Sequence, residues 1–412
     1  MLDVLIVGGG ASGLALGAML KEKDSSLSVT VAEQLDRVGK KLAITGNGRC
    51  NITNKLLHKD NFHSHFNDKA IQTVSDFDFT KTSKFFSGLG IEFSFENNKA
   101  YPLSFQASSV VDVFRFILEK QNVKVETNCK ITEIKKEGNV FKAYTESRKV
   151  LKAKCVVIAT GGLAGGNKLG STGDGYRLLK SFGHKIYEQK PVIVQVKTDN
   201  TFTRQLKGIK VTAEASVIVN SKTIKKDCGE VLFCDYGLSG PPILQLSRYL
   251  TKGAEISLDL LKDLDTQDII KLLNKRADIF KDVPLTDFFA GFIHKKLGQI
   301  ILKKCGLSLS MSGADLTPKD INNIAKVLKA FKFKYEGNTG FANAQSTSGG
   351  ADLSDFSENF MSKKQKGLFA MGEVLDVDGD CGGYNLQWAW SSANAVSNGI
   401  LSYLRIKGIK ND

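Results

Sequence analysis

The chain has 412 residues, which is enough for two or three domains, and its 42% apolar content is that of an ordinary globular protein. It contains no apolar stretch long enough to cross a bilayer, and its seven scattered cysteines form no C-x-x-C pair, which argues against a zinc ribbon or a dithiol redox centre. Unpatterned cysteines in odd number are typical of free thiols in the reducing cytoplasm, where we expect this protein. The net charge is +14, of which +9 lies between residues 190 and 335, and a lysine-rich solvated surface is the simplest interpretation.

A strand, a glycine-rich turn and a helix open the chain. Residues 4–7 form a short apolar run, as in a strand buried on both faces, and the turn after it has the G-x-G-x-x-G spacing at Gly8, Gly10 and Gly13. In such a turn the first glycine allows the tight bend, the second lets the backbone approach a pyrophosphate, and the third lets the helix pack on the strand. We expect a helix over residues 11–23, and the N–H groups at its start, at Ala11 and Ser12, would point at phosphates.

An acidic residue follows at the position that selects the nucleotide. A second strand is expected over residues 28–32, and after it come Glu33, which is 20 residues beyond Gly13, and Gln34. A carboxylate at this spacing binds the ribose of an adenosine, whereas an NADP site usually has a cation near it. The pattern therefore predicts an FAD or NAD site, with a simple strand-to-helix turn as the alternative.

Residues 36–54 form a polar, glycine-rich segment without helical or strand periodicity. The segment is too long for a simple connector, and its Gly, Asn, Thr and Arg residues supply many hydrogen-bond donors. We interpret it as a loop that covers a cofactor, with disorder as the alternative.

The following segments complete a sheet. A helix is expected over residues 108–121, then a three-stranded meander over 124–134, 140–145 and 150–155, and then a buried strand that ends at Ala159-Thr160-Gly161. A meander that feeds such a strand is familiar from glutathione-reductase-type FAD domains. In that arrangement Ile131 would lie against the adenine, and Thr160 and Gly161 would lie at the carboxyl end of the sheet, where ligands bind.

The periodicity then changes twice. Residues 191–262 have β periodicity, and residues 263–333 have helical periodicity, with a capping pattern at Thr317-Pro318-Lys319-Asp320. A buried strand over 367–371 precedes Gly372 and Glu373. We therefore predict an FAD-binding domain in two segments, 1–190 and 334–412, with a β-rich insert over 191–262 and a helical insert over 263–333.

Five motifs occur in order along the chain, at residues 39–54, 170–176, 237–241, 347–350 and 372–390. In these motifs the sequence resembles the YhiN/BaiN-type family, bacterial flavoproteins described as predicted NAD(P)/FAD-dependent oxidoreductases or aminoacetone-oxidase-like enzymes. The resemblance implies an α/β fold, in which a Rossmann-like, glutathione-reductase-type FAD-binding domain carries an inserted β-barrel-like domain and an inserted helical domain.

The resemblance also assigns residues to the cofactor. The opening turn and Glu33 would bind the ADP half, the polar loop would approach the ribityl chain and the ring, and Glu373 would bind ribityl hydroxyls. A second glycine turn would run under the flavin and open the last helix, whose N-terminus would favour the negative charge of the reduced ring. The residues are Lys41, Asn47, Gly48, Arg49, Cys50 and Asn51 in the loop, and Gly383, Tyr384, Asn385, Leu386 and Gln387 in the turn.

Some of these residues have simpler interpretations. Arg49 could form an ion pair that fixes its loop, and Trp388 and Trp390 could be packing residues of the last helix. Cys50 and Cys381 are interpreted as inert small side chains, because a reactive thiolate cannot be inferred from sequence alone.

The primary hypothesis for the function is an FAD-dependent oxidoreductase that transfers a hydride between the flavin and a small organic substrate. The sequence has no second strand-turn-helix unit with the G-x-G-x-x-G spacing, so NAD(P)H, if it is the donor, would bind transiently. It also has no metal-ligand pattern, and the catalytic residues stay unassigned. One alternative is an amine oxidase that uses oxygen. Another is a flavin-containing RNA-binding protein, which Lys295-Lys296 and Lys303-Lys304 favour but the scarcity of arginine and the lack of an RNP-like motif in the insert oppose.

Overall fold

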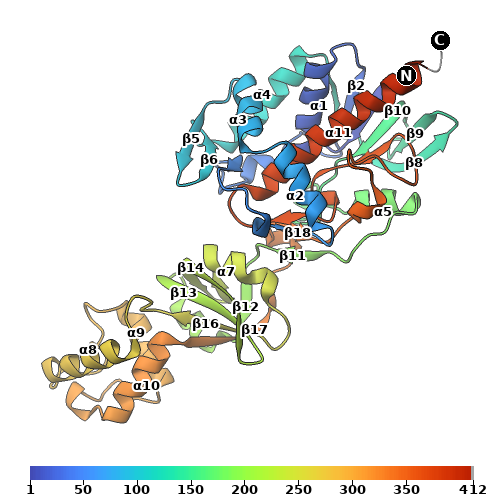
Figure 1. The fold of residues 1–412 in the computed structure, drawn as a ribbon. Coiled ribbons are helices and arrows are strands. Elements are labelled where there is room, and N and C mark those ends of the chain that lie inside the picture. The colour runs from blue at the N-terminus through green and yellow to red at the C-terminus, as the bar shows by residue number, and fades with distance from the viewer. Residues whose placement is uncertain (410–412) are drawn as a thin grey trace. The chain divides into compact units, whose positions relative to one another are not determined.

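The computed structural model describes residues 1–409 of the chain (Figure 1). Its contacts divide the chain into two compact units. Unit 1 consists of Met1–Pro191 together with the C-terminal segment from Phe341, and unit 2 is Val192–Gly340. Each unit has its own buried apolar cluster. No helix among the described residues combines the length and apolarity that a membrane crossing requires.

A seven-stranded sheet forms the centre of unit 1, with the strand order β7-β2-β1-β10-β9-β8 and with β19 paired to β10. Strands β7 (Lys124–Glu126), β2 (Val29–Ala32), β1 (Leu2–Val7), β10 (Val150–Ile158) and β19 (Leu368–Ala370) run parallel. Strands β8 (Ile131–Glu137) and β9 (Val140–Thr145) form an antiparallel meander with the first half of β10. The predicted Rossmann-type α/β class is therefore confirmed.

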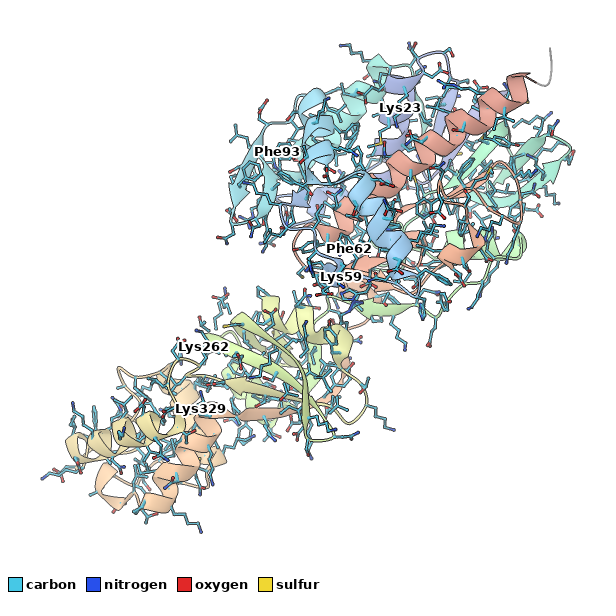
Figure 2. The ribbon with its side chains drawn as sticks, in the orientation of Figure 1. Lys23, Lys59, Phe62, Phe93, Lys262 and Lys329 are labelled. Carbon is cyan, nitrogen blue, oxygen red and sulfur yellow. The ribbon has the colours of Figure 1, made fainter. Side chains whose placement is uncertain are left out.

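Helices from both ends of the chain cover this sheet. The helices of unit 1 are α1 (Ala11–Lys23), α2 (Asn67–Asp76), α3 (Phe79–Gly88), α4 (Ala107–Lys120), α5 (Asp174–Ser181) and α11 (Tyr384–Ile409). Helices α1 and α11 lie side by side in Figure 1. The Lys23 ammonium at the end of α1 (Lys23 is labelled in Figure 2) donates to Ser397 Oγ at 2.7 Å and to Asn398 Oδ1 at 2.8 Å. The first and last helices of the chain are thus joined directly.

Short strands from distant parts of the chain form three small sheets in unit 1. They are β3 (Thr53–Asn54) with β6 (Lys99–Pro102) and β5 (Phe93–Glu96), then β4 (Phe62–His63) with β20 (Asp378–Gly379), and β11 (Lys190–Val192) with β18 (Ser346–Ser348). The polar loop of residues 36–54 leads into the first of these sheets, so it is held at its C-terminal end.

Unit 2 is a closed six-stranded barrel that carries three longer helices. The barrel strands are β12 (Val196–Thr198), β15 (Gly237–Ser239), β14 (Lys222–Cys234), β13 (Lys210–Val219), β16 (Glu255–Asp259) and β17 (Phe331–Asn338). The short helices α6 (Asn200–Thr203) and α7 (Pro241–Leu246) also belong to this unit. Along the chain, β16 is followed by α8 (Thr266–Ile279), α9 (Lys295–Lys304) and α10 (Pro318–Lys329), and then by β17. The sequence-based boundary at residue 334 falls inside β17, because this strand closes the barrel and the unit continues to Gly340.

Alternating burial explains why this part of the chain forms a barrel. Ala213, Ala215 and Val217 of β13 are fully buried, while the residues between them are half-buried. Phe233, Phe331 and Phe333 pack against one another in the same core, with ring centroids 4.5–6.4 Å apart. Helix α10 begins with the predicted capping box, in which Thr317 Oγ1 accepts from the Asp320 N–H and the Asp320 carboxylate accepts from the Thr317 N–H.

Candidate cofactor site

Four segments meet at one edge of the unit 1 sheet, where its parallel strands have their carboxyl ends. Gly8 follows β1, Glu33 follows β2, Thr160 lies just beyond β10, and Gly372 lies just beyond β19. Because ligands of open α/β sheets bind at this edge, the topology places the predicted cofactor residues from both ends of the chain where a dinucleotide would bind.

The three glycines of the opening turn have different surroundings. A Cβ on Gly8, whose φ is +113°, would lie 2.5 Å from the Ala159 carbonyl oxygen, and a Cβ on Gly13 would lie 2.0 Å from the Gly8 carbonyl oxygen. A Cβ on Gly10 would meet no protein atom within 4 Å, and the same is true of Gly161. Packing within the protein therefore requires Gly8 and Gly13 but not Gly10, so the backbone at Gly10 is free to be approached by a pyrophosphate.

The first turn of α1 contacts the C-terminal segment. Ser12 is buried, and a Cβ on Gly372 would lie 2.7 Å from its Oγ. The Gly372 N–H donates to Ser392 Oγ on α11 at 3.0 Å. Ala11 and Ser12 are therefore placed beside the second glycine-rich segment.

Glu33 is buried at the end of β2. One carboxylate oxygen accepts from the Gly9 N–H at 2.8 Å and the other from the Leu35 N–H at 2.9 Å. Burial raises the pKa of this carboxyl, and the backbone N–H donors partly offset that effect. The neighbouring Gln34 donates to the Gly170 carbonyl oxygen at 2.7 Å, so it secures the turn before α5.

An ion pair connects the polar loop to the C-terminal segment. Lys41 Nζ lies 2.7 Å from one carboxylate oxygen of Glu373, and the other oxygen accepts from the Thr347 N–H at 2.8 Å. Thr347 Oγ1 in turn accepts from the N–H groups of Leu163 and Ala164, both at 2.9 Å. Lys41 and Glu373, which the resemblance places beside the ribityl chain, are thus brought together, and Thr347 is a supporting residue that the sequence analysis did not assign.

The rest of the polar loop is fixed by contacts within unit 1. Asn47 and Cys50 have left-handed backbones, with φ of +59° and +58°, on either side of Gly48. The Arg49 guanidinium donates to both carboxylate oxygens of Glu96 at 2.9 Å and lies 4.6 Å from the Tyr101 ring centroid. The loop-fixing alternative for Arg49 is therefore the one that this geometry supports.

Cys50 has the environment of an inert thiol. The side chain is fully buried, and burial raises its pKa to about 12. A thiolate is accordingly disfavoured at neutral pH, which agrees with the interpretation of Cys50 as a small packing residue.

The second glycine turn leads directly into α11. Gly383 has a φ of +96°, and a Cβ there would lie 2.8 Å from the Thr53 carbonyl oxygen and 2.9 Å from Asn51 Oδ1. Helix α11 begins at the next residue, Tyr384, which is buried against Phe62. Asn385 bonds both the N–H and the carbonyl of Gly379, at 2.9 and 2.8 Å, while Leu386 is half-buried. The turn therefore packs closely against the loop that contains Asn51.

Gln387 and the two tryptophans hold the last helix in place. The Gln387 side chain is 0% exposed, donates to the Phe77 carbonyl and accepts from the Thr53 hydroxyl. Trp388 Nε1 donates to the Gly372 carbonyl at 3.0 Å, and Trp390 Nε1 donates to the Ile52 carbonyl at 2.9 Å. These bonds occupy the polar atoms of all three side chains, which agrees with the packing interpretation of the tryptophans. The contact of Gln387 with the cofactor stays a prediction.

Three buried oxygens in this region have no hydrogen-bond partner among the described residues. They are Asn51 Oδ1, Thr160 Oγ1 and the hydroxyl of Tyr176. Leaving a buried polar group without a partner costs about 1–3 kcal/mol, so such groups call for an explanation. A polar ligand supplies one, and together with the open backbone at Gly10 and Gly161 these oxygens show that the residues fit an FAD.

Tyr176 was not assigned from the sequence, although it ends one of the five motifs. Its polar tip within a glycine-rich segment is the signal that could have found it. The contact of Ile131 with the adenine stays a prediction, since the structure shows only that Ile131 is buried at the start of β8.

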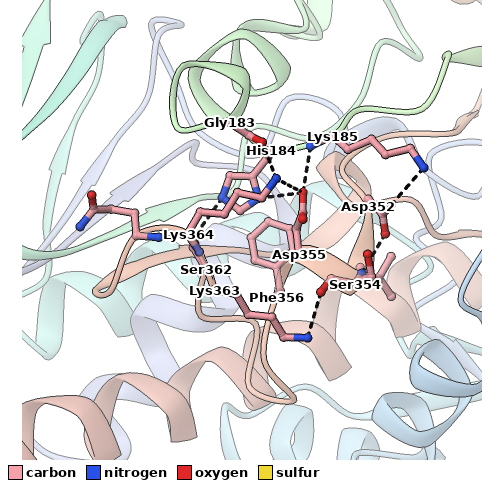
Figure 3. Close-up of polar contacts among 12 residues, drawn as sticks. Gly183, His184, Lys185, Asp352, Ser354, Asp355, Phe356, Ser362, Lys363 and Lys364 are labelled. Carbon is pink, nitrogen blue, oxygen red and sulfur yellow. Dashed lines mark hydrogen bonds and ion pairs between the residues drawn. The ribbon is translucent and has the colours of Figure 1, made fainter.

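His184 lies among polar contacts with Ser362 and Asp355 (Figure 3). Ser362 Oγ is 2.8 Å from His184 Nε2, and His184 Nδ1 is 3.5 Å from an Asp355 carboxylate oxygen. The order resembles a hydrolytic triad, but Ser362 is only 2% exposed and its Oγ accepts from the N–H groups of Lys364 and Gln365. The cluster therefore fixes the loop before β19 and has no access for a substrate.

Comparison with known proteins identifies the family. Residues 2–399 match the family described as HI0933-like protein Rossmann domain. The chain belongs to the HI0933-like family. It is 31% identical over 94% of its length to the 3-dehydro-bile acid delta(4,6)-reductase of Clostridium scindens, of which the match covers 96%. It is 28% identical over 97% of its length to the ribosomal RNA dihydrouridine synthase of Escherichia coli, of which the match covers 98%.

A solved structure supports the fold. The Sdh1 complex of Mycobacterium smegmatis in its apo form superposes with a TM-score of 0.50 at 16% identity, covering 98% of this chain and 68% of that one. The family membership and the named relatives confirm the resemblance to the YhiN/BaiN-type flavoproteins. This HI0933-like protein is therefore an enzyme, an FAD-dependent oxidoreductase.

Proposed function

We propose that this enzyme reduces the C5=C6 double bond of uracil in ribosomal RNA, with NAD(P)H as the transient electron donor. The proposal rests on the chemistry that is common to the two reactions named for the relatives. A 3-dehydro bile acid with double bonds at positions 4 and 6 has a carbon–carbon double bond conjugated to a carbonyl, and so does uracil. In both reductions a hydride and a proton add across such a bond.

The chain's own residues would position the cofactor for this reaction. Gly10 and the first N–H groups of α1 would bind the pyrophosphate, and Glu33 would bind the adenosine ribose. Lys41 and Glu373 would hold the ribityl chain, and the N-terminus of α11 would stabilise negative charge beside the ring. FAD, when bound, supplies the hydride. The protein contributes orientation, exclusion of water and a fixed electrostatic environment, and no residue is assigned as the proton donor.

Charge favours RNA over a small molecule as the substrate. Residues 190–335 carry 24 Lys and Arg against 15 Asp and Glu, and nearly all of this segment lies in unit 2. The match to the ribosomal RNA enzymes covers 96–97% of the chain, so it includes this basic unit. A basic surface is the electrostatic signature of nucleic-acid binding. A ribosomal RNA substrate also agrees with the cytoplasmic location expected from the cysteines.

Reduction of a small conjugated ketone is the second candidate, and the 31% identity to the bile acid reductase favours it. The oxygen-dependent amine oxidase stays a prediction, because neither named relative is an oxidase.

The test uses the FAD-loaded protein under anaerobic conditions with NADPH or NADH. The substrates are unmodified ribosomal RNA transcripts and, separately, a steroid 4,6-dien-3-one. We expect RNA digests to contain a uridine that has gained two hydrogen atoms by mass spectrometry, and the Gly10→Ser variant, which should bind FAD poorly, to leave the RNA unchanged. Reduction of the steroid without reduction of RNA would establish the second candidate, and failure with both substrates would refute the reaction class.

A further inference from the structure

The helical part of unit 2, residues 263–333, is divided in charge. Residues 263–290, which include α8, carry four Lys and Arg against six Asp. Residues 291–333, which include α9 and α10, carry eight Lys against two Asp. The excess positive charge is therefore concentrated on one half of this small domain and is not spread as a uniform solvated surface.

Four lysines of the basic half are exposed and have no ion-pair partner within the described part of the chain. Lys296 and Lys303 are seven residues apart on α9, and Lys319 and Lys326 are seven residues apart on α10. Because seven residues are nearly two helical turns, each pair lies on one face of its helix. Other lysines of unit 2 do form ion pairs, such as Lys329 on α10 with Asp259 at 2.5 Å (Lys329 is labelled in Figure 2) and Lys271 with Asp268 at 3.2 Å.

The buried faces of the two helices hold these lysines outward. Leu297, Ile300 and Ile301 of α9 and Ile321, Ile324 and Leu328 of α10 belong to the apolar core of unit 2. Neither helix can rotate without exposing this apolar surface, so each lysine pair is presented to solvent on a fixed support.

On this basis we propose that α9 and α10 form the surface that binds the phosphate backbone of the RNA substrate. The inference rests on the proposed function and adds where the RNA is bound. Lysine provides a mobile point charge and lacks the planar fork of arginine that reads bases, so this surface would attract phosphates without selecting a sequence. The scarcity of arginine and the lack of an RNP-like motif in the insert, which oppose sequence-specific RNA recognition, agree with a surface of this kind.

The experiment compares two variants that each lose four positive charges. The test variant is Lys296→Gln, Lys303→Gln, Lys319→Gln and Lys326→Gln. The matched control is Lys262→Gln, Lys271→Gln, Lys275→Gln and Lys281→Gln, whose lysines are also exposed and lie in or beside the acidic half. Glutamine has nearly the helix propensity of lysine, so both variants should fold. Retained FAD and an unchanged circular dichroism spectrum would verify this. Binding of unmodified ribosomal RNA transcripts is measured over a series of salt concentrations.

We expect the test variant to bind at least about tenfold more weakly near physiological salt. The slope of log K against log salt should flatten by about 0.9 for each RNA phosphate that the variant no longer neutralises. The control should keep an affinity within about twofold of the parent, since its lysines would lie off the RNA path. Reduction of the small steroid substrate, if it occurs, should be equal in all three proteins.

Two results would overturn the inference while leaving the proposed function intact: a test variant that binds RNA as well as the parent, or a control that is weakened as much as the test variant. A parent protein that binds no RNA even at low salt would refute the proposed function itself, and the inference with it. Binding to anionic phospholipid vesicles in place of RNA would have the same consequence.

Discussion

Gly8, Gly10 and Gly13 occur in one turn for different physical reasons. Close approach of backbone atoms excludes a side chain at Gly8 and Gly13, whereas nothing in the protein excludes one at Gly10. The spacing predicts all three because a strand-turn-helix that binds a pyrophosphate is built locally. The orphaned oxygens of Asn51 and Tyr176 could not be predicted in the same way, since their burial depends on segments far away in the sequence.

Substitutions at Gly10 and Gly13 should therefore affect two different properties, the affinity for FAD and the stability of the apoprotein. Gly10 is the N-cap residue of α1, and serine is also favoured at this position. We therefore expect Gly10→Ser to change the melting temperature of the apoprotein little and to lower the affinity for FAD at least about tenfold. Gly13→Ala should lower the melting temperature by roughly 5 °C or more, because the new methyl group would overlap the Gly8 carbonyl. Thermal unfolding of the apoprotein and fluorescence titration with FAD measure the two effects. A melting temperature of Gly10→Ser that falls as far as that of Gly13→Ala would contradict the assignment of Gly10 to the pyrophosphate.

At the scale of secondary structure, sequence periodicity predicts the long elements well and the short ones poorly. The helix expected over 11–23 is α1, and the strand expected over 28–32 contains β2. Residues 53–102 form β3 to β6, α2 and α3, and no element was predicted there. Strands of two to four residues, such as β4 and its partner β20, have no periodicity of their own and form because tertiary packing brings them together. Because β5, which contains Glu96, was not predicted, the contact of Arg49 with Glu96 could not be predicted either.

The loop before β19 gives a pH-dependent prediction. Burial lowers the pKa of His184, so the neutral ring is the folded form despite the nearby Asp355 carboxylate. The unfolded chain, with an ordinary histidine pKa of about 6.5, then binds the proton more readily than the folded chain. The contribution of His184 to stability is present above about pH 6.5 and is lost as the pH falls below that value toward the lowered pKa.

Replacing this ring with a neutral amide should remove part of the acid sensitivity. We expect His184→Gln to lose less stability than the parent between pH 7.5 and pH 5.5, by at most about 1 kcal/mol, as measured by chemical denaturation at both pH values. The matched control is His58→Gln, because the His58 side chain is 66% exposed. Equal pH dependence in His184→Gln and the parent would show that His184 is not the titrating group.

At the scale of the whole molecule, the protein has two separate apolar cores. One is built from both ends of the chain around the seven-stranded sheet, and the other fills the barrel and its helices. The cofactor residues named above all lie in the first unit, while the second unit carries +7 of the net charge of +14. Composition and periodicity could indicate this division, but the closure of the barrel by β17 could not be predicted, because its partners β12 and β16 are distant in sequence.

Calorimetry should therefore resolve two unfolding transitions. FAD at about 100 times its Kd should stabilise the transition of unit 1 by about 2.7 kcal/mol and leave that of unit 2 unchanged, since a ligand stabilises only the cooperative unit that binds it. Limited proteolysis followed by mass spectrometry would assign each transition to its residues. A single transition that FAD shifts as a whole would show that the two cores unfold together.

The pairing of β11 with β18 has a structural consequence. One strand immediately precedes the insert and the other soon follows it, so the chain leaves and re-enters the cofactor domain through neighbouring strands, which in a paired sheet lie about 5 Å apart. An exchange of the insert would leave the register of the cofactor sheet untouched. The insert is thus a module joined to the cofactor domain at one pair of strands, so substitutions on its surface leave the sheet that positions the cofactor residues unchanged.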